Sequence, residues 1–306
     1  MSWSGTKMRR ISNSEVATWL TCRRQYYYAF DMGIAPKQRF NNPGKVSTLA
    51  IGTLGHEILA IYYEGLKYDM SVEEAREGAR HQIAMLMMNP QHYSVPIVSA
   101  TSAILERYWS FYAKDDYERF EVLDVEKEYD IPLTDEFSYV FRFDLLLKER
   151  RTPKIGLTDH KFKYDFFSDE AISLSGQLPK YVGALRYNGV NPDFVWLNQI
   201  RAKPAAKEWG PKDFFRRSPV TPSNFKVTTA IREQVIASQE IAEWREQPDE
   251  VKKATALRSM DSFPNPCGKC PFNLICRMEY DGGNINLIVA KEFGPNSYNY
   301  NRDEAL

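Results

Sequence analysis

The chain has 306 residues, of which 43% are apolar and 13% aromatic, so it is long enough to fold around a sizeable core. Its 40 basic and 40 acidic residues cancel, which excludes overall charge as the means of holding a polyanion and leaves that task to local basic segments. No signal-peptide pattern is found, and no apolar run reaches the roughly 18 residues that a membrane span needs. We therefore expect a cytoplasmic protein.

Helical periodicity dominates the first third of the sequence. The stretch from Ser12 to Glu15 has the pattern of a capping box, and the helix that it opens carries Cys22 about three turns from its start. Three further amphipathic helices are predicted at 52–67, 71–88 and 98–113.

The period then changes to that of strands. Three β-branched and aromatic runs, at 121–131, 137–147 and 155–162, predict a meander. They are followed by a predicted helix at 170–187, a buried strand at 194–200, a connection at 203–223 and a long helix at 228–244.

This order predicts an α/β fold in which helices flank a central mixed sheet. We expect one domain over residues 1–280, with a helical part at 1–118, a catalytic sheet and helix at 119–202, and a C-terminal helix and cysteine segment at 203–280. The sequence of residues 281–306 is polar and rich in asparagine, which predicts a flexible tail.

Three of the four cysteines, Cys267, Cys270 and Cys276, lie within ten residues, and Cys22 lies near the start of the chain. Cytosolic thiols are kept reduced, which favours metal ligation over disulfides. The spacing leaves two metals open, because zinc usually takes ligands as two close pairs and a [4Fe-4S] cluster takes four thiolates at unequal spacing. Four unrelated buried cysteines are the remaining interpretation.

An Asp-x-Lys pattern lies in the predicted strand at 155–162. Side chains alternate along a strand, so Asp159 and Lys161 project from one face and His160 from the other. Asp144, at the end of the preceding strand, can meet Asp159 across the sheet, and Mg²⁺ or Mn²⁺ would relieve the repulsion between these carboxylates. Lys161 could orient a water or stabilise developing charge. An isolated Asp-x-Lys is more commonly a surface ion pair.

Two further features accompany this pattern. His56 lies at the start of a predicted helix and could add an imidazole to the same metal, or simply pack within the helix. Gln177 and Tyr181 are four residues apart and therefore share one helix face, where they could contact DNA or tie the helix to the sheet.

In this order the motifs resemble the iron-sulfur-containing PD-(D/E)xK nucleases. His56, Asp144, Asp159-His160-Lys161 and Gln177-x3-Tyr181 follow one another between Cys22 and the three late cysteines. The Cas4 proteins and the AddB nuclease domain have this arrangement, and the RecB-type nuclease domain shares the catalytic motifs. The resemblance covers about residues 12–277. The chain departs from the family at Val140–Phe143, where a glycine is common, and at His160, where an apolar residue is more usual.

The resemblance implies a restriction-endonuclease-like core and a role for each motif. Asp144, Asp159 and His56 would be metal ligands, the backbone carbonyl of His160 would complete the Mg²⁺ or Mn²⁺ shell, and Lys161 would be the catalytic lysine. Gln177 and Tyr181 would contact DNA near the scissile phosphate. The cysteines Cys22, Cys267, Cys270 and Cys276 would hold a [4Fe-4S] cluster that joins the N- and C-terminal segments.

The expected function is that of a metal-dependent deoxyribonuclease, most simply an exonuclease on single-stranded DNA or duplex ends that hydrolyses phosphodiesters through a metal-bound water. One alternative is a DNA-binding iron-sulfur component of a recombination or CRISPR-adaptation complex, whose nuclease site is idle or depends on a protein partner. A second alternative is a zinc-stapled nucleic-acid adaptor.

Overall fold

The computed structural model describes residues 9–37, 46–90, 92–135, 137–203, 210–260 and 266–296. The chain divides into two compact units, each assembled from separate stretches. Unit 1 comprises Met1–Arg39, Asp130–Val140 and Ile231–Leu306, and unit 2 comprises Phe40–Tyr129 and Phe141–Ala230. Within the described residues, no helix is both long enough and apolar enough to cross a membrane.

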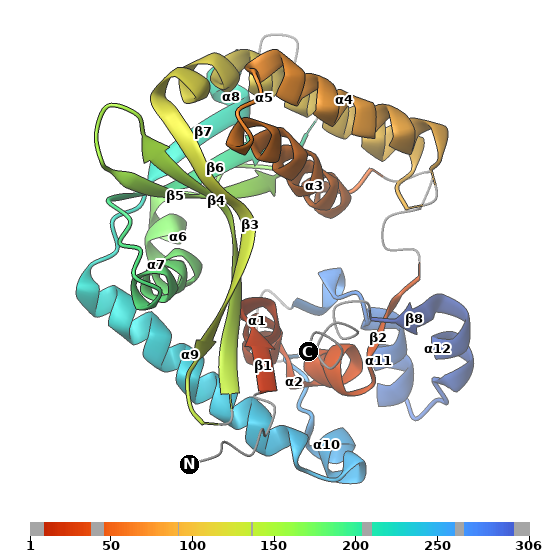
Figure 1. Cartoon of the computed structure of the whole chain (residues 1–306). Coiled ribbons are helices and arrows are strands. Elements are labelled where there is room, and N and C mark those ends of the chain that lie inside the picture. The colour runs from red at the N-terminus through yellow and green to blue at the C-terminus, as the bar shows by residue number, and fades with distance from the viewer. Residues whose placement is uncertain are drawn as a thin grey trace, which may run out of the picture. The chain divides into compact units, whose positions relative to one another are not determined.

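Unit 2 is built on a mixed sheet (Figure 1). Its strands are β5 (Ile155–Lys163), β6 (Phe194–Arg201), β7 (Phe215–Pro219) and the greater part of β3 (Phe120–Pro132) and β4 (Phe137–Glu149). The end of β3 and the start of β4, at Asp130–Val140, belong to unit 1. β3 pairs with β4, β4 runs antiparallel to β5, β5 parallel to β6, and β6 antiparallel to β7. The predicted meander and the mixed sheet are therefore confirmed.

Three helices form a layer on this sheet: α3 (Thr48–Lys67), α4 (Val72–Met88) and α5 (Val95–Arg119). Their apolar faces pack with β4, β5 and β6 into one core, in which Leu54, Ile58 and Leu105 are fully buried. A capping box at Ser71 and Glu74 starts α4. We attribute the longer extent of α5, compared with the predicted 98–113, to its packing against α3 and α4, because tertiary contacts outweigh the weak intrinsic propensity of its ends.

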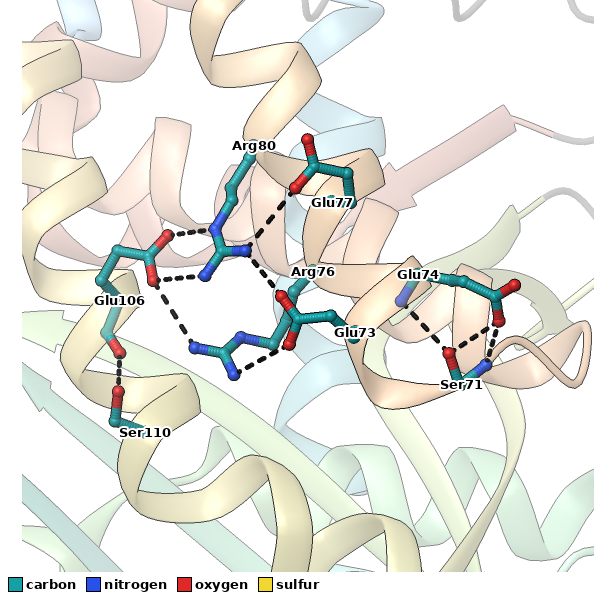
Figure 2. Close-up of polar contacts among 8 residues, drawn as sticks. All are labelled: Ser71, Glu73, Glu74, Arg76, Glu77, Arg80, Glu106 and Ser110. Atoms are coloured by element: carbon teal, nitrogen blue, oxygen red, sulfur yellow. Dashed lines mark hydrogen bonds and ion pairs between the residues drawn. The ribbon is translucent and has the colours of Figure 1, made fainter.

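Ion pairs join the outer faces of α4 and α5 (Figure 2). The guanidinium of Arg80 donates two hydrogen bonds to Glu106, at 2.8 and 3.0 Å, and a third to Glu73 at 2.8 Å. Arg76 reaches both carboxylates, at 3.4 Å from Glu73 and 3.6 Å from Glu106. Exposed pairs contribute little singly, but this bidentate network fixes how α4 lies along α5.

On the other side of the sheet the predicted helix at 170–187 is two helices, α6 (Asp169–Leu174) and α7 (Gln177–Tyr187). The break falls at Ser175 and Gly176, and α7 begins at Gln177 with Gly176 as its N-cap residue. The predicted connection at 203–223 contains a short helix, α8 (Pro211–Phe214), and β7, while 204–209 lies outside the described residues. β7 forms because β6 offers it a free edge, which the polar stretch at 215–219 does not reveal.

Unit 1 begins with β1 (Arg9–Ser12), which pairs in parallel with the start of β4, and α1 (Asn13–Thr21). Ser12 caps α1 by accepting from the Glu15 N–H, but the Glu15 side chain does not complete a capping box. It accepts instead from Tyr26 and Arg245. A short α2 (Arg23–Tyr26), a π-helix at Tyr27–Asp31 and β2 (Ile34–Pro36) follow.

The later part of unit 1 contains most of α9 (Asn224–Arg245), then α10 (Asp249–Thr255), a 3-10 turn at Pro266–Lys269 and α11 (Asn273–Tyr280). The flexible tail predicted from residue 281 is wrong as far as residue 296, because α12 (Asn286–Glu292) and β8 (Phe293–Pro295) lie there. β8 pairs with β2, and Phe293 stacks on Phe272 in a buried cluster. Residues 297–306 lie outside the described residues.

Candidate active site

The site of unit 2 lies where β4 and β5 part. Leu145 and Thr158 are the last partners in the β4–β5 register, so Asp144 and Asp159 are the first residues beyond the ladder. The carboxylate of Asp144 accepts a hydrogen bond from the His160 backbone N–H at 2.5 Å. A side chain thus satisfies a donor that the ladder leaves unpaired, and this bond holds Asp144 against the Asp159–Lys161 segment.

α3 brings His56 to the same place. Its Nδ1 is 3.4 Å from Asp144 Oδ2 and 3.8 Å from Glu126 Oε1. The close approach of α3 to β5 requires Gly55, because a Cβ there would lie 2.3 Å from the Phe162 ring. Glycine beside the histidine therefore sets how deeply His56 reaches toward the strands.

His56, Glu126 and Asp144 form a candidate metal site. One nitrogen or oxygen from each lies within 4.8 Å of the others, and in the described part of the chain this is the only such group of three. Carboxylate oxygens with one imidazole suit Mg²⁺ or Mn²⁺. The donor set therefore fits the metal that the sequence predicted, with Glu126 as an unforeseen member.

Glu126 lies in β3 with a φ of +45°, a left-handed conformation that non-glycine residues rarely adopt. Its other carboxylate oxygen is 2.9 Å from Arg142 Nε on β4. Such backbone strain often accompanies function. The sequence carries no signal for this residue, because Glu126 is one of several acidic residues in an alternating strand.

Asp159 and Lys161 form an ion pair beside this group. Lys161 Nζ is 3.0 Å from Oδ1 and 2.8 Å from Oδ2 of Asp159, whose side chain is almost fully buried. The two residues share one strand face, as the alternation predicts. Asp159 is not one of the three residues that converge within 4.8 Å, so the predicted metal set of His56, Asp144, Asp159 and His160 is brought together only in part.

The pKa values of the two aspartates are shifted in opposite directions. Burial raises the pKa of Asp159 to about 6, against the pull of Lys161. Burial would also raise the pKa of Asp144, but the facing His56 holds it well below its usual range. Burial alone would lower the pKa of His56, and the Asp144 carboxylate instead raises it to about 10. Without metal, the site is therefore balanced by a protonated imidazole.

Lys161 stays an ammonium ion. Burial would lower its pKa, but the carboxylates of Asp159 and Asp144 raise it above its ordinary value. A lysine in this state donates hydrogen bonds and positive charge and does not accept a proton. Its chemistry here is the stabilisation of negative charge on a bound group.

His160 faces away from Asp159 and Lys161, into the helical layer. It is 2% exposed, and its ring stacks on Tyr63 of α3 at 5.7 Å. The Asn198 amide nitrogen lies 2.8 Å from its Nδ1 and 2.8 Å from the Tyr108 hydroxyl. Burial lowers the pKa of His160 to about 3, so the ring is neutral. A polar partner on β6 thus explains a histidine in a buried position.

Gln177 and Tyr181 meet on one face of α7, where the Gln177 amide donates to the Tyr181 hydroxyl at 2.7 Å. The Tyr181 ring is buried and packs on Phe141 of β4 at 5.7 Å, three residues before Asp144. The contacts of Tyr181 therefore tie α7 to the strand that carries Asp144.

The four cysteines all lie in unit 1, and none forms a disulfide. Cys22 is the residue between α1 and α2, in extended conformation, rather than three turns into one helix. Burial, with smaller contributions from the thiols of Cys22, Cys276 and Cys267, raises the pKa of Cys270 to about 11. No three of the four sulfurs come within 4.8 Å of one another, since the described residues contain no such group with a cysteine.

Two solved structures have limited likeness to this chain. A candidate exonuclease from Eubacterium rectale shares 12% identity over 84% of this chain and 86% of its own, with a TM-score of 0.46. A protein named SSO0001 shares 13% identity over 89% and 87%, with a TM-score of 0.36. No curated protein matches the sequence.

The family model of the PD-(D/E)XK nuclease superfamily matches residues 10–277. This range contains His56, the diverging strands with Asp144 and Asp159, and Lys161. The chain therefore belongs to the PD-(D/E)XK nuclease superfamily.

Proposed function

We propose that this protein is a metal-dependent deoxyribonuclease that acts as an exonuclease on single-stranded DNA or duplex ends. The observation that carries the proposal is the convergence of His56, Glu126 and Asp144 within 4.8 Å, next to the Asp159–Lys161 pair. A binding module has no need for so many charged groups at the parting of two strands, where their burial is costly.

We assign each residue of the site a separate role. His56, Glu126 and Asp144 would hold Mg²⁺ or Mn²⁺, with Asp159 and the His160 carbonyl as the further ligands that the family resemblance implies. When bound, the metal would lower the pKa of water and neutralise phosphate charge. Lys161, an ammonium ion, would stabilise the negative charge that grows on the phosphate during cleavage. Asp159 orients Lys161 through their ion pair.

Cleavage of an end-labelled single strand and of the matching duplex tests the proposal, each with Mg²⁺, Mn²⁺ or chelator. We expect metal-dependent shortening of the wild type, and a loss of at least about 10²-fold in both Asp159→Ala and Lys161→Ala, because each removes charge from the site. Lys114→Ala, which alters an exposed lysine on α5, should cleave like the wild type.

Full metal-dependent cleavage by both site variants would refute this assignment. No cleavage by the wild type, with DNA binding retained, would favour the second candidate, a DNA-binding iron-sulfur component of a recombination or CRISPR-adaptation complex. The four thiols of unit 1 are the observation that keeps this candidate open.

We also propose that Cys22, Cys267, Cys270 and Cys276 hold a [4Fe-4S] cluster. The four thiols all lie in unit 1, and the thiols of Cys22, Cys276 and Cys267 contribute to the raised pKa of Cys270. Four thiolates at unequal spacing in the chain are the ligand set that a [4Fe-4S] cluster takes. Stoichiometric zinc in the purified protein would refute the cluster.

A further inference from the structure

Three basic side chains form cation–π contacts with aromatic rings near the end of β5. Lys163 Nζ lies 4.8 Å from the centre of the Phe167 ring, and Lys203 Nζ lies 4.8 Å from that of Tyr164. The guanidinium of Arg201 lies 4.2 Å from the Phe166 ring. We call these six residues the aromatic-cation strip: Lys163, Tyr164, Phe166, Phe167, Arg201 and Lys203.

The strip lies beyond the candidate active site, at the end of the strand that carries Lys161. β5 and β6 are parallel and end together, with Lys163 opposite Arg201. Lys163 is two residues after Lys161 and therefore on the same strand face, about 6.6 Å further along. A strand of nucleic acid whose phosphate lies at Lys161 would reach Lys163 with the next part of its backbone.

Hydrogen bonds from neighbouring strands hold the backbone of the segment that carries the rings. The Phe167 N–H donates to Oε1 of the fully buried Gln199 at 2.7 Å, and the Ala202 N–H donates to the Lys163 carbonyl at 2.7 Å. Arg216 on β7 contacts the Phe167 carbonyl and pairs with Asp169. The rings are thus presented by a fixed backbone, so little order would have to be created on binding.

Tyr164 is the exposed member of the strip, with 59% of its surface in contact with solvent. No hydrophobic core requires a ring at this position. Its neighbour Asp165 accepts from Lys203 at 2.7 Å and lies 3.8 Å from Arg201. One carboxylate therefore faces two cations, which leaves net positive charge beside the exposed Tyr164 ring.

We propose that the aromatic-cation strip binds single-stranded DNA, with a base stacked on Tyr164 and the backbone phosphates at Lys163 and its neighbouring cations. This inference rests on the proposed nuclease function and narrows its substrate. Bases in a duplex keep their faces stacked inside the helix, so only an unpaired strand can use Tyr164. The strip therefore favours single strands over duplex at this site.

Binding of a dye-labelled oligothymidylate in chelator, where cleavage does not occur, tests the strip in the full chain. Tyr164→Ala should weaken binding at least about 5-fold without changing the salt dependence, because a stacked base is lost and no charge is removed. Lys163→Gln should instead reduce the slope of log K against log salt by about 0.7. Tyr68→Ala, which alters a similarly exposed tyrosine at the far end of α3 from His56, should match the wild type.

An oligonucleotide of the same length whose sugars carry no bases separates stacking from charge. Wild type and Tyr164→Ala should bind it equally. The strip is refuted if Tyr164→Ala binds oligothymidylate like the wild type, and also if the variant weakens both oligonucleotides equally. Metal-dependent cleavage by the wild type, measured in parallel, shows separately whether the nuclease proposal stands. A wild type that binds no DNA overturns both.

Discussion

A proton and a metal ion compete for His56. The facing carboxylates favour the imidazolium, whose pKa is raised to about 10, whereas a metal ligand must be neutral. In an unfolded chain the pKa of a histidine is about 6.5. Because the folded chain raises this pKa, His56 contributes its full stabilisation to the metal-free fold below about pH 6.5. That contribution is lost as the pH rises toward 10.

This competition predicts proton release on metal binding. At pH 7.5, Mn²⁺ should displace about one proton per chain, and its affinity should increase with pH over the range below 10. Calorimetry in two buffers of different ionisation enthalpy measures the proton count. His56→Gln should bring it near zero, while His81→Gln, on the exposed face of α4, should leave it unchanged. Equal heats in both buffers for the wild type would contradict the prediction.

Glu126 is the other residue on which the metal should depend. Replacing it by glutamine keeps the size of the side chain but removes one of the charges around the ion. We expect Glu126→Gln to weaken Mn²⁺ binding by about 10- to 100-fold, of the order seen when groups that support a metal site are lost. Titration of Mn²⁺ against DNA cleavage measures this. Glu121→Gln, near the start of β3 and with a side chain 51% exposed, is the control. Equal metal requirements in the two variants would exclude Glu126 as a ligand.

At the scale of elements, the contact between α3 and β5 decides whether a metal site exists at all. His56 comes from the helix and Asp144 from the strand next to β5, so their separation follows the helix position. The Phe162 ring lies where the side chain of any larger residue at position 55 would begin. Packing at Gly55 is thus coupled to the geometry of the site.

Gly55→Ala should therefore lower both stability and cleavage. Forcing a methyl group against a buried ring typically costs about 1–3 kcal/mol. Urea unfolding measures the loss, and adding Phe162→Leu should restore part of it by making room. Gly78→Ala on α4, which meets no atom within 4 Å, should be neutral or stabilising by up to about 1 kcal/mol. An unchanged unfolding midpoint for Gly55→Ala would show that α3 can shift freely.

At the scale of the whole molecule, unit 1 is the part whose stability should depend on the thiols. It draws on three separate stretches of chain, and its cysteines come from the first and the last of them. Ligation to one cluster would join residues that are far apart in sequence. This lowers the conformational entropy of the unfolded chain and adds the binding energy of the cluster to the free energy of folding.

Cys270→Ser should therefore lose iron and weaken unit 1 more than unit 2. We expect about four iron atoms per chain in anaerobically purified wild type. Hydrogen exchange of the variant should speed up in α1, α2 and α11, with smaller changes in α3 and α5. Asp159→Ala should keep its iron, since its site lies in unit 2. Equal exchange in wild type and variant would show that the thiols do not hold unit 1 together.

Periodicity and alternation by themselves determined the features that depend on near neighbours. They placed Asp159 and Lys161 on one face of β5, predicted the β3–β4–β5 meander, and located the helices that became α3, α4 and α9. These patterns depend only on residues a few positions apart, so the linear sequence contains them.

Tertiary structure alone decided which groups meet. Glu126 joins His56 and Asp144 from a position of β3 where φ is positive, and no residue type in that stretch predicts this conformation. Cys22 ends α1 instead of continuing a helix, and residues 281–296 are ordered by β8 pairing with β2. The partners in the metal group and in the β2–β8 pair are distant in the chain, and contact energies between distant residues outweigh the small local preferences that a sequence displays.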